Sequence, residues 1–318
     1  MNTKYVKIGL VIIMNLTTNE KRYNTLNNFY RHKFGKKVFK VSLNANFTCP
    51  NIVDGVGCIF CLEGSGEYAG NPAKPLQSQF DTVKARMLNK WPDAYTIAYF
   101  QANTNTLGEI GYLKNLYETA LTLDDSIVGI SISTRPDCIS DELMDYFEEL
   151  SKRTYLTIEL GLQSAKDSSL LFLRRGHTVE DFVKTTRELR RRGINVIAHI
   201  INGLPNESKD DMLDTIKLLN TLDIQGLKIH LLHIMEGTSL GDLYKEDKFK
   251  TISQVEYTDI VCSQIEILND NIILHRLTGD APKESLIEPV WSLKKFVVMN
   301  EIDKEMRTRN SYQGCLTK

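Results

Sequence analysis

Short apolar runs rich in β-branched residues alternate with amphipathic stretches along most of the chain. Between the runs, apolar residues recur at helical spacing, for example over residues 141–153, 178–193 and 208–223. We predict a strand at each run and a helix between consecutive runs. The predicted strands are Lys37–Phe47, Tyr95–Ala102, Ser126–Thr134, Tyr155–Gln163, Ile194–Pro205 and Gly226–Ile234.

This alternation predicts an α/β fold in which parallel strands are joined by right-handed helical crossovers. Six strand–helix units cover roughly residues 37–245, and the alternation alone fits either a doubly wound sheet or a barrel. No Gly-x-Gly-x-x-Gly follows the first strand, which disfavours a dinucleotide-binding fold. After about residue 250 we predict a helix over 253–268 and a further strand within 271–277.

Composition limits the class of protein. The chain has 318 residues, 42% of them apolar, and a net charge of -1, which describes a globular protein without an overall attraction to nucleic acid or membranes. The apolar segment Ile8–Met14 is too short to span a bilayer. We expect residues 1–20 to be a weakly ordered extension, with Met14 an alternative start. Six cysteines without a secretory signal predict a cytoplasmic protein.

Three of the cysteines lie within thirteen residues, in the loop after the first predicted strand. These are Cys49, Cys58 and Cys61 of "CPNIVDGVGCIFC". Three thiolates suit a [4Fe–4S] cluster with one iron left open. Zinc would need a fourth ligand such as Cys138 or a distant histidine, a redox CxxC pair would leave Cys49 unexplained, and purely structural thiols would not require this spacing. The residues alone leave these alternatives open.

The Cys-x8-Cys-x2-Cys loop, with Phe60 between its last two cysteines, resembles the radical S-adenosylmethionine (radical SAM) superfamily. Its spacing is closer to that of the Elongator catalytic subunit than to the common Cys-x3-Cys-x2-Cys. From about residue 21 onward, further segments resemble the YtqA/YhcC-type subfamily. They include "CIFCLEGSGEYAG", "STRPDCI", "IELGLQS", "LRRGH", "AHIINGLPNE", "KIHLLHIMEGT" and "HRLTGDAP".

The resemblance implies a partial (β/α)6 TIM-like barrel of the radical SAM type over residues 21–250. It implies a C-terminal extension, residues 251–318, that closes the side of the barrel. It also implies a [4Fe–4S] cluster held by the three cysteines. Bound S-adenosylmethionine (SAM) would be cleaved reductively to a 5′-deoxyadenosyl radical, with electrons from a flavodoxin- or ferredoxin-type donor.

The resemblance also assigns SAM contacts at the ends of successive strands. Asn103, and more loosely Gln101, takes the place of a GGE-like motif that grips the amino group. Ser133 stands where relatives carry a glutamate. The complete set of expected cofactor contacts, each of which also has an ordinary structural interpretation, is Phe60, Asn103, Ser133, Gln163, Arg175 and His199.

Other polar residues near these positions carry weaker expectations. Arg135 and Asp137 form a candidate ion pair, and Cys138 is a candidate functional thiol. Strand periodicity places His230 and His233 on different faces, so at most one of them should face the barrel interior. His275, Arg276 and Asp280 should close the open side of the barrel. Cys262 is expected to be a thiol of a helix core, and Cys315 has no assignment.

The substrate is the least determined feature. Basic segments at 31–37, 187–193 and 292–296 would attract phosphates, although solvated helix faces explain them equally well. The resemblance implies tRNA, in particular the 5-aminomethyl-type side chain of the wobble uridine. The alternatives are a radical SAM enzyme acting on a small metabolite or a protein, and a non-enzymatic iron–sulfur or zinc protein.

Overall fold

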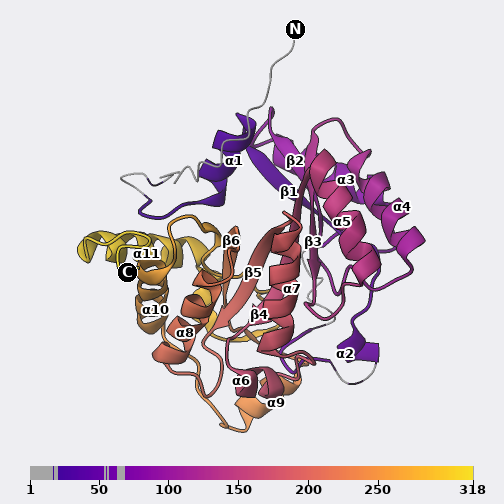
Figure 1. Ribbon diagram of the computed structural model, residues 1–318. Helices are drawn as coiled ribbons and strands as arrows, with labels where there is room; N and C mark the ends of the chain where they lie inside the picture. Colours follow the sequence, from indigo (N-terminus) through magenta and orange to yellow (C-terminus); the bar gives the residue numbers. More distant parts are fainter. Residues whose placement is uncertain (1–16, 18–20, 54, 56, 63–68, 318) are drawn as a thin grey trace.

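A single curled sheet of seven parallel strands forms the centre of the molecule (Figure 1). The computed structural model describes residue 17 and residues 21–317, except 54, 56 and 63–68. The strand order is β1-β2-β3-β4-β5-β6-β8, so neighbours in the sheet follow one another along the chain. The strands are β1 (Val38–Leu43), β2 (Tyr95–Phe100), β3 (Ile127–Thr134), β4 (Tyr155–Gln163), β5 (Asn195–Asn202), β6 (Gly226–Leu231) and β8 (Ile273–Arg276).

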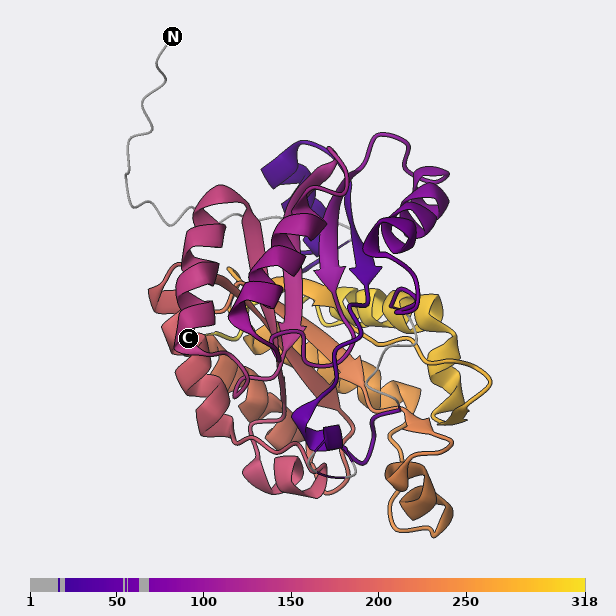
Figure 2. The same ribbon diagram turned by 90° about the vertical axis from the view of Figure 1, so that its right-hand side faces the viewer.

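Helices cover the convex face of the sheet, as the turned view shows (Figure 2). The outward-facing side chains of the strands, such as Val41, Phe100, Ile132 and Leu160, pack beneath them in one large apolar cluster. The helices are α1 (Leu26–Phe34), α2 (Pro50–Val53), α3 (Leu76–Leu88), α4 (Ile110–Leu121), α5 (Asp141–Arg153), α6 (Asp167–Phe172), α7 (Val179–Arg191), α8 (Lys209–Asn220), α9 (Ser239–Lys245), α10 (Gln254–Ile267) and α11 (Lys295–Thr308).

The C-terminal part adds to the barrel. Strand β8 pairs with β6 and becomes the seventh strand of the sheet, and α10 packs against α8 and α11. A short antiparallel pair, β7 (Ile234–Met235) and β9 (Leu286–Glu288), is followed by the 3-10 helix η2 (Val290–Leu293). The predicted partial barrel is therefore confirmed, with one more strand than the six units expected.

Local sequence sets the helix starts. Thr178 and Asp181 form a reciprocal capping box at α7, and Ser208 and Asp211 form one at α8. Each satisfies backbone N–H groups that the first turn of a helix leaves without a partner. Both N-caps are the first residues of helical stretches that the sequence predicted, 178–193 and 208–223.

The two edge strands of the sheet do not pair with each other. Helix α1 contacts both β1 and β8, and a parallel bridge joins Thr25 to Leu274 at the same end. The barrel is thus open along one side and covered by α1 near the N-terminal ends of its strands. Among the described residues, no helix has the length and apolar character that crossing a bilayer requires.

Candidate functional site

The cysteine loop leaves the C-terminal end of β1, the end at which barrel enzymes place their active sites. None of the three cysteines forms a disulfide, and Cys58 is buried while Cys49 and Cys61 are partly exposed. The N–H of Cys61 donates to the carbonyl of Cys58 at 3.1 Å, which turns the chain between them. Residues 54, 56 and 63–68 of this loop lie outside the described part of the chain.

Asn51 fastens the loop to the turn after α6. Its amide nitrogen donates to the carbonyls of Arg174 and Arg175, at 2.7 and 2.8 Å, and lies 3.2 Å from Cys58 Sγ. Arg135 donates to the Asn51 side-chain oxygen. Asn51 was missed by the sequence reasoning, because the segment that it reaches is more than a hundred residues away along the chain.

The Arg135–Asp137 ion pair is confirmed, and it supports the cysteine loop. Arg135 is buried and holds both carboxylate oxygens, with Nε–Oδ1 at 2.9 Å and Nη2–Oδ2 at 2.6 Å. Its Nη1 lies 4.0 Å from Cys49 Sγ. Burial and the neighbouring Asp137 carboxylate raise the pKa of Cys138 to about 12, so this thiol is protonated near neutral pH.

Within the described ranges, no three His, Cys, Asp or Glu side chains converge into a metal site. The three cysteines as a ligand set therefore remain a prediction. The donors nevertheless fit an iron–sulfur cluster: three cysteines that form no disulfide lie on one loop, and the cationic Arg175 and the Asn51 amide both approach Cys58. Such N–H donors stabilise thiolate and sulfide charge.

Arg175 has spare hydrogen-bonding capacity at this site. Its Nη1 lies 3.5 Å from Cys58 Sγ and its Nη2 lies 3.4 Å from the Gly161 carbonyl, while the buried Nε has no partner. A buried guanidinium with one unpaired donor and two long contacts is suited to bind a carboxylate. The side chain is 9% exposed, so a ligand would meet it largely desolvated.

Gln163 and Asn103 both adopt left-handed backbone conformations, with φ of 72° and 60°. Gln163 ends β4 beyond a register shift, and the Asn103 amide nitrogen donates to the Phe47 carbonyl at 2.8 Å. The buried Oδ1 of Asn103 has no partner among the described residues. Backbone strain in non-glycine residues concentrates at functional sites, which favours a role for both. Gln101 instead accepts from Ser42 at 3.0 Å, and Phe60 packs on a small apolar cluster around Ile59.

A polar network fills the barrel interior around Glu159 of β4. This carboxylate accepts hydrogen bonds from Lys40 and Lys228, from Ser131 at 2.7 Å and from Tyr99 at 2.9 Å. The donors come from β1, β6, β3 and β2. Strands that are not neighbours can meet only across the concave face, so these side chains lie in the lumen.

Two predicted SAM contacts belong to this network. His199 Nε2 lies 2.7 Å from Glu159 Oε2, and Ser133 lies 3.0 Å from the Tyr99 hydroxyl and 3.5 Å from Glu159. Glu159, Lys40 and Lys228 were missed as site residues. A signal was present, since each places a charge within an otherwise apolar strand and a buried charge requires a partner.

The electrostatics of the lumen follow from burial. Burial alone would raise the pKa of Glu159, but Lys228 and Lys40 outweigh it and hold the pKa well below its usual value. Burial lowers the pKa of Lys228 to about 7, and it lowers the pKa of His199 to about 4, with the Lys228 charge acting in the same direction. Neutral His199 therefore donates through Nε2 to the ionised Glu159, which leaves its Nδ1 as an acceptor.

The expectation that His230 and His233 face opposite sides is wrong. Both imidazole rings lie beside Gly279. A Cβ atom placed on this glycine would lie 3.6 Å from His230 Nδ1 and 3.2 Å from His233 Cε1, so the two rings are on the same side. Strand β6 ends at Leu231, so the period-two alternation stops before His233.

Arg276 of β8 pairs with Asp280 at 3.4 Å, and Lys295 pairs with the same carboxylate at 2.6 Å.

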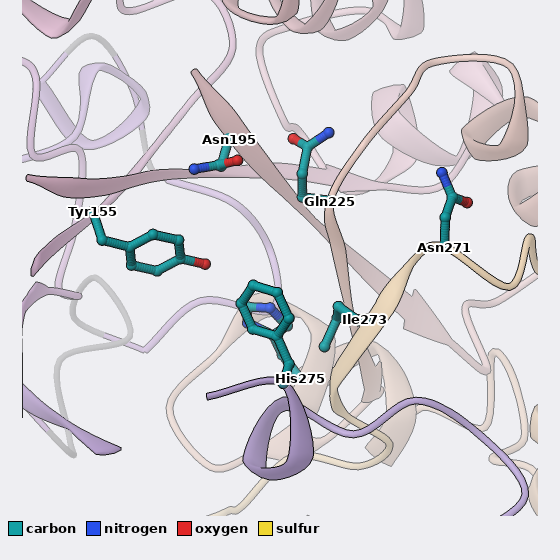
Figure 3. Close-up of a pocket in the computed structure, with 7 residues that line it drawn as sticks. Tyr155, Asn195, Gln225, Asn271, Ile273 and His275 are labelled. Atoms are coloured by element: carbon teal, nitrogen blue, oxygen red, sulfur yellow. The ribbon is translucent and has the colours of Figure 1, made fainter. Parts of the chain in front are cut away.

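A pocket of about 220 Å³ lies at the other end of the strands, beneath α1 (Figure 3). Most of its amide groups are already engaged, since Asn195 donates to the Leu156 carbonyl at 3.0 Å and Gln225 accepts from the Val196 N–H at 2.9 Å. The pocket lies at the end of the barrel opposite the cysteine loop. The lining residues are Phe29, Tyr155, Asn195, Gln225, Asn271, Ile273 and His275.

Comparisons with known proteins identify relatives of the whole chain. A family model described as the radical SAM superfamily matches residues 49–219, and one described as the radical SAM C-terminal domain matches residues 224–308. YtqA of Bacillus subtilis is 48% identical over 93% of this chain and 92% of its own length. This match confirms the resemblance to the YtqA/YhcC-type subfamily.

More distant relatives share the fold or part of the sequence. The tRNA uridine(34) acetyltransferase of Methanocaldococcus jannaschii is 27% identical over 82% of this chain and 55% of its own length. The solved structure of Methanocaldococcus infernus Elp3 with an N-terminal deletion superposes with a TM-score of 0.67, at 21% identity, over 87% of this chain and 64% of that chain. The structural match confirms the curled half-barrel.

Proposed function

The chain belongs to the radical SAM superfamily, and on that premise we propose that this radical SAM enzyme modifies tRNA, at a 5-aminomethyl-type side chain of the wobble uridine. The enzyme class follows from the family. The tRNA substrate is supported by the match of 82% of the chain to a tRNA uridine(34) acetyltransferase. A radical SAM enzyme acting on a small metabolite or a protein is the alternative, and so is a non-enzymatic cluster or zinc protein.

Cys49, Cys58 and Cys61 would hold the [4Fe–4S] cluster, and Arg135 and Asn51 would fix their loop. With SAM bound, the cluster would supply reductive cleavage of the sulfonium to a 5′-deoxyadenosyl radical. An electron donor of the flavodoxin or ferredoxin type would provide the reducing equivalents. None of the described cysteines forms a disulfide, which supports a cytoplasmic location.

The remaining SAM contacts would use atoms that lack partners at present. Arg175 would bind the carboxylate through its unpaired Nε, and the unpaired Oδ1 of Asn103 would accept a hydrogen bond from the ammonium group. His199 would accept a ribose hydroxyl at Nδ1. Gln163, Ser133 and the backbone at Phe60 would complete the cradle and exclude water.

One of the three basic segments keeps its charge available for RNA. At the C-terminal end of α7, the described contacts pair Arg190, Arg191 and Arg192 with carboxylates. In contrast, no ion pair is recorded among the described residues for Arg31, Lys33, Lys36, Lys37 or Lys90, which lie near one another at the N-terminal ends of β1 and β2. Lysines there stand over the rings of Trp91, Tyr95 and Tyr155. Exposed cations interleaved with aromatic rings favour phosphate-backbone binding.

Replacing Arg175 with alanine should weaken SAM binding roughly tenfold or more while iron content stays unchanged, because a buried charged contact is lost. Equilibrium dialysis of SAM against the reconstituted protein measures the affinity. Arg175→Lys is the matched control and should recover little, since an ammonium cannot reproduce the paired N–H geometry. Unchanged affinity in Arg175→Ala would remove this role.

A deletion strain tests the substrate. Mass spectrometry of tRNA nucleosides should show the wobble uridine side chain arrested at an earlier stage. The wild-type gene should restore the pattern and a Cys58→Ala gene should not. An unaltered nucleoside profile, combined with SAM cleavage by the purified protein, would favour the metabolite or protein alternative.

A further inference from the structure

The barrel lumen carries more positive than negative charge. Lys40 and Lys228 both pair with Glu159, and the charge of Arg276, which itself pairs with Asp280, acts on Lys228. Glu159 is almost completely buried, and the side chains of Lys40 and Lys228 are 13% and 11% exposed. Two ammonium groups that share one buried carboxylate leave a positive charge uncompensated, which is costly in a desolvated interior.

The two lysines also retain donor capacity. Lys40 donates to Glu159 and Ser131, and Lys228 donates to Glu159 and Tyr99. An ammonium group has three N–H bonds, so one on each lysine remains for a ligand. Both nitrogens stand over the same Tyr99 ring, at 4.8 and 4.6 Å from its centroid. The spare donors therefore lie in one region of the lumen.

Histidines on the β5–β8 side add unsatisfied nitrogen atoms. Among the described residues, His230 Nε2, His233 Nε2 and His275 Nδ1 are buried without hydrogen-bond partners. The His230 ring lies 5.3 Å from that of His199, which belongs to the Glu159 network. Burial lowers the pKa of all three, so they are neutral and supply hydrogen bonds without charge. Unpaired buried polar atoms of this kind indicate a missing partner.

We propose that Lys40 and Lys228, together with His230 and His233, form a subsite in the lumen that binds an anionic group of the substrate. The excess positive charge and the spare ammonium hydrogens favour an acceptor that carries negative charge, and an unpaired imidazole nitrogen that carries its proton would donate to the same group. The inference rests on the proposed function, because it takes the side chain of a tRNA uridine as the carrier of the anion.

The state of Lys228 supports this subsite. Burial is the main cause of its pKa of about 7. The Glu159 carboxylate raises this pKa, and the charges of Lys40 and Arg276 lower it. Tyr99 and the neutral His199 and His230 complete its surroundings. An anion would favour the protonated form. Anion binding should therefore strengthen as pH falls from 8 to 6, through the range in which Lys228 gains its proton.

The decisive experiment compares two anticodon stem-loops with the reconstituted full chain in the presence of SAM. They differ only in the wobble side chain, which ends in a carboxylate (5-carboxymethylaminomethyl) or in the neutral amide of the same shape. Fluorescence anisotropy should show the carboxylate form binding about tenfold more tightly to wild type. In Lys228→Gln the ratio should fall close to one, measured at saturating SAM. Lys40→Gln gives a second variant, and the exposed Lys245→Gln is the matched control.

Each outcome of this experiment supports or overturns the subsite. Equal affinity of wild type for both stem-loops overturns the subsite. Loss of SAM affinity in Lys228→Gln would assign the anion to SAM itself and also overturns it. If neither stem-loop binds, the tRNA proposal fails, and the subsite is tested by thermal unfolding in sodium acetate against equal sodium chloride. Stabilisation by acetate in wild type but not in Lys228→Gln supports the subsite, and no difference overturns it.

Discussion

Cys58→Ala protein reconstituted anaerobically with iron and sulfide is expected to lose most of its iron and its visible charge-transfer absorption. Formation of 5′-deoxyadenosine from SAM should drop by at least about 100-fold, because loss of a ligand exceeds the 10- to 100-fold effects typical of residues that only support ligands. Cys58 is the buried member of the three and lies within reach of both Asn51 and Arg175, so no exposed group can replace it. Cys49→Ala should behave in the same way.

Cys315→Ala is the matched control for this loss. Cys315 is another free, partly exposed thiol, and it lies in the C-terminal segment, so its replacement should leave iron content and SAM cleavage at wild-type values. Iron is measured colorimetrically and 5′-deoxyadenosine by chromatography after reduction. Retention of full iron and absorption in Cys58→Ala would contradict the assignment of the loop to a cluster and return zinc to consideration.

The regular part of the fold could be predicted because it is specified locally. Strand β4 and helix α5 have the bounds that the pattern predicted, 155–163 and 141–153. Each contains a continuous period, two for the strand and 3.6 for the helix, and Ser140 caps α5 at its start. The apolar run at 226–234 instead breaks into β6 and β7, since apolar character continues where the strand pairing stops.

The residues of the site could be predicted only where a sequence motif identifies them. The cysteine loop, Gln163, Arg175 and His199 were expected through resemblance, whereas Asn51 and Glu159 act through partners from distant parts of the chain. The left-handed backbone of Gln163 has no signal in residue type, whereas asparagine, the residue at position 103, is enriched in that conformation. The charges of Lys40, Glu159 and Lys228 were visible in their strands, but only the curl of the sheet shows that they meet.

Glu159→Gln should give the largest loss of stability of any single change in the lumen. The variant keeps the size of the side chain but leaves Lys40 and Lys228 without a carboxylate, and breaking a buried ion pair on one side costs about 3–5 kcal/mol of unfolding free energy. Urea unfolding at pH 7 measures it. Glu236→Gln, which removes an exposed partner of Lys245, is the control and should cost less than about 1 kcal/mol.

The pH dependence of this loss separates charge from packing. Without Glu159, the pKa of Lys228 should fall further below the value of about 7 that it has in the wild type. Consider a pH between the pKa of Lys228 in the folded wild type and its lower pKa in the folded variant. There Lys228 is protonated in the wild type, as it is in the unfolded chain, while in the folded variant Lys228 is neutral. The variant therefore binds fewer protons than its unfolded state, and its deficit relative to wild type should widen as pH falls below about 7, while staying nearly constant between pH 8 and 9. A deficit independent of pH would mean that Glu159 stabilises the barrel by packing and hydrogen bonding alone.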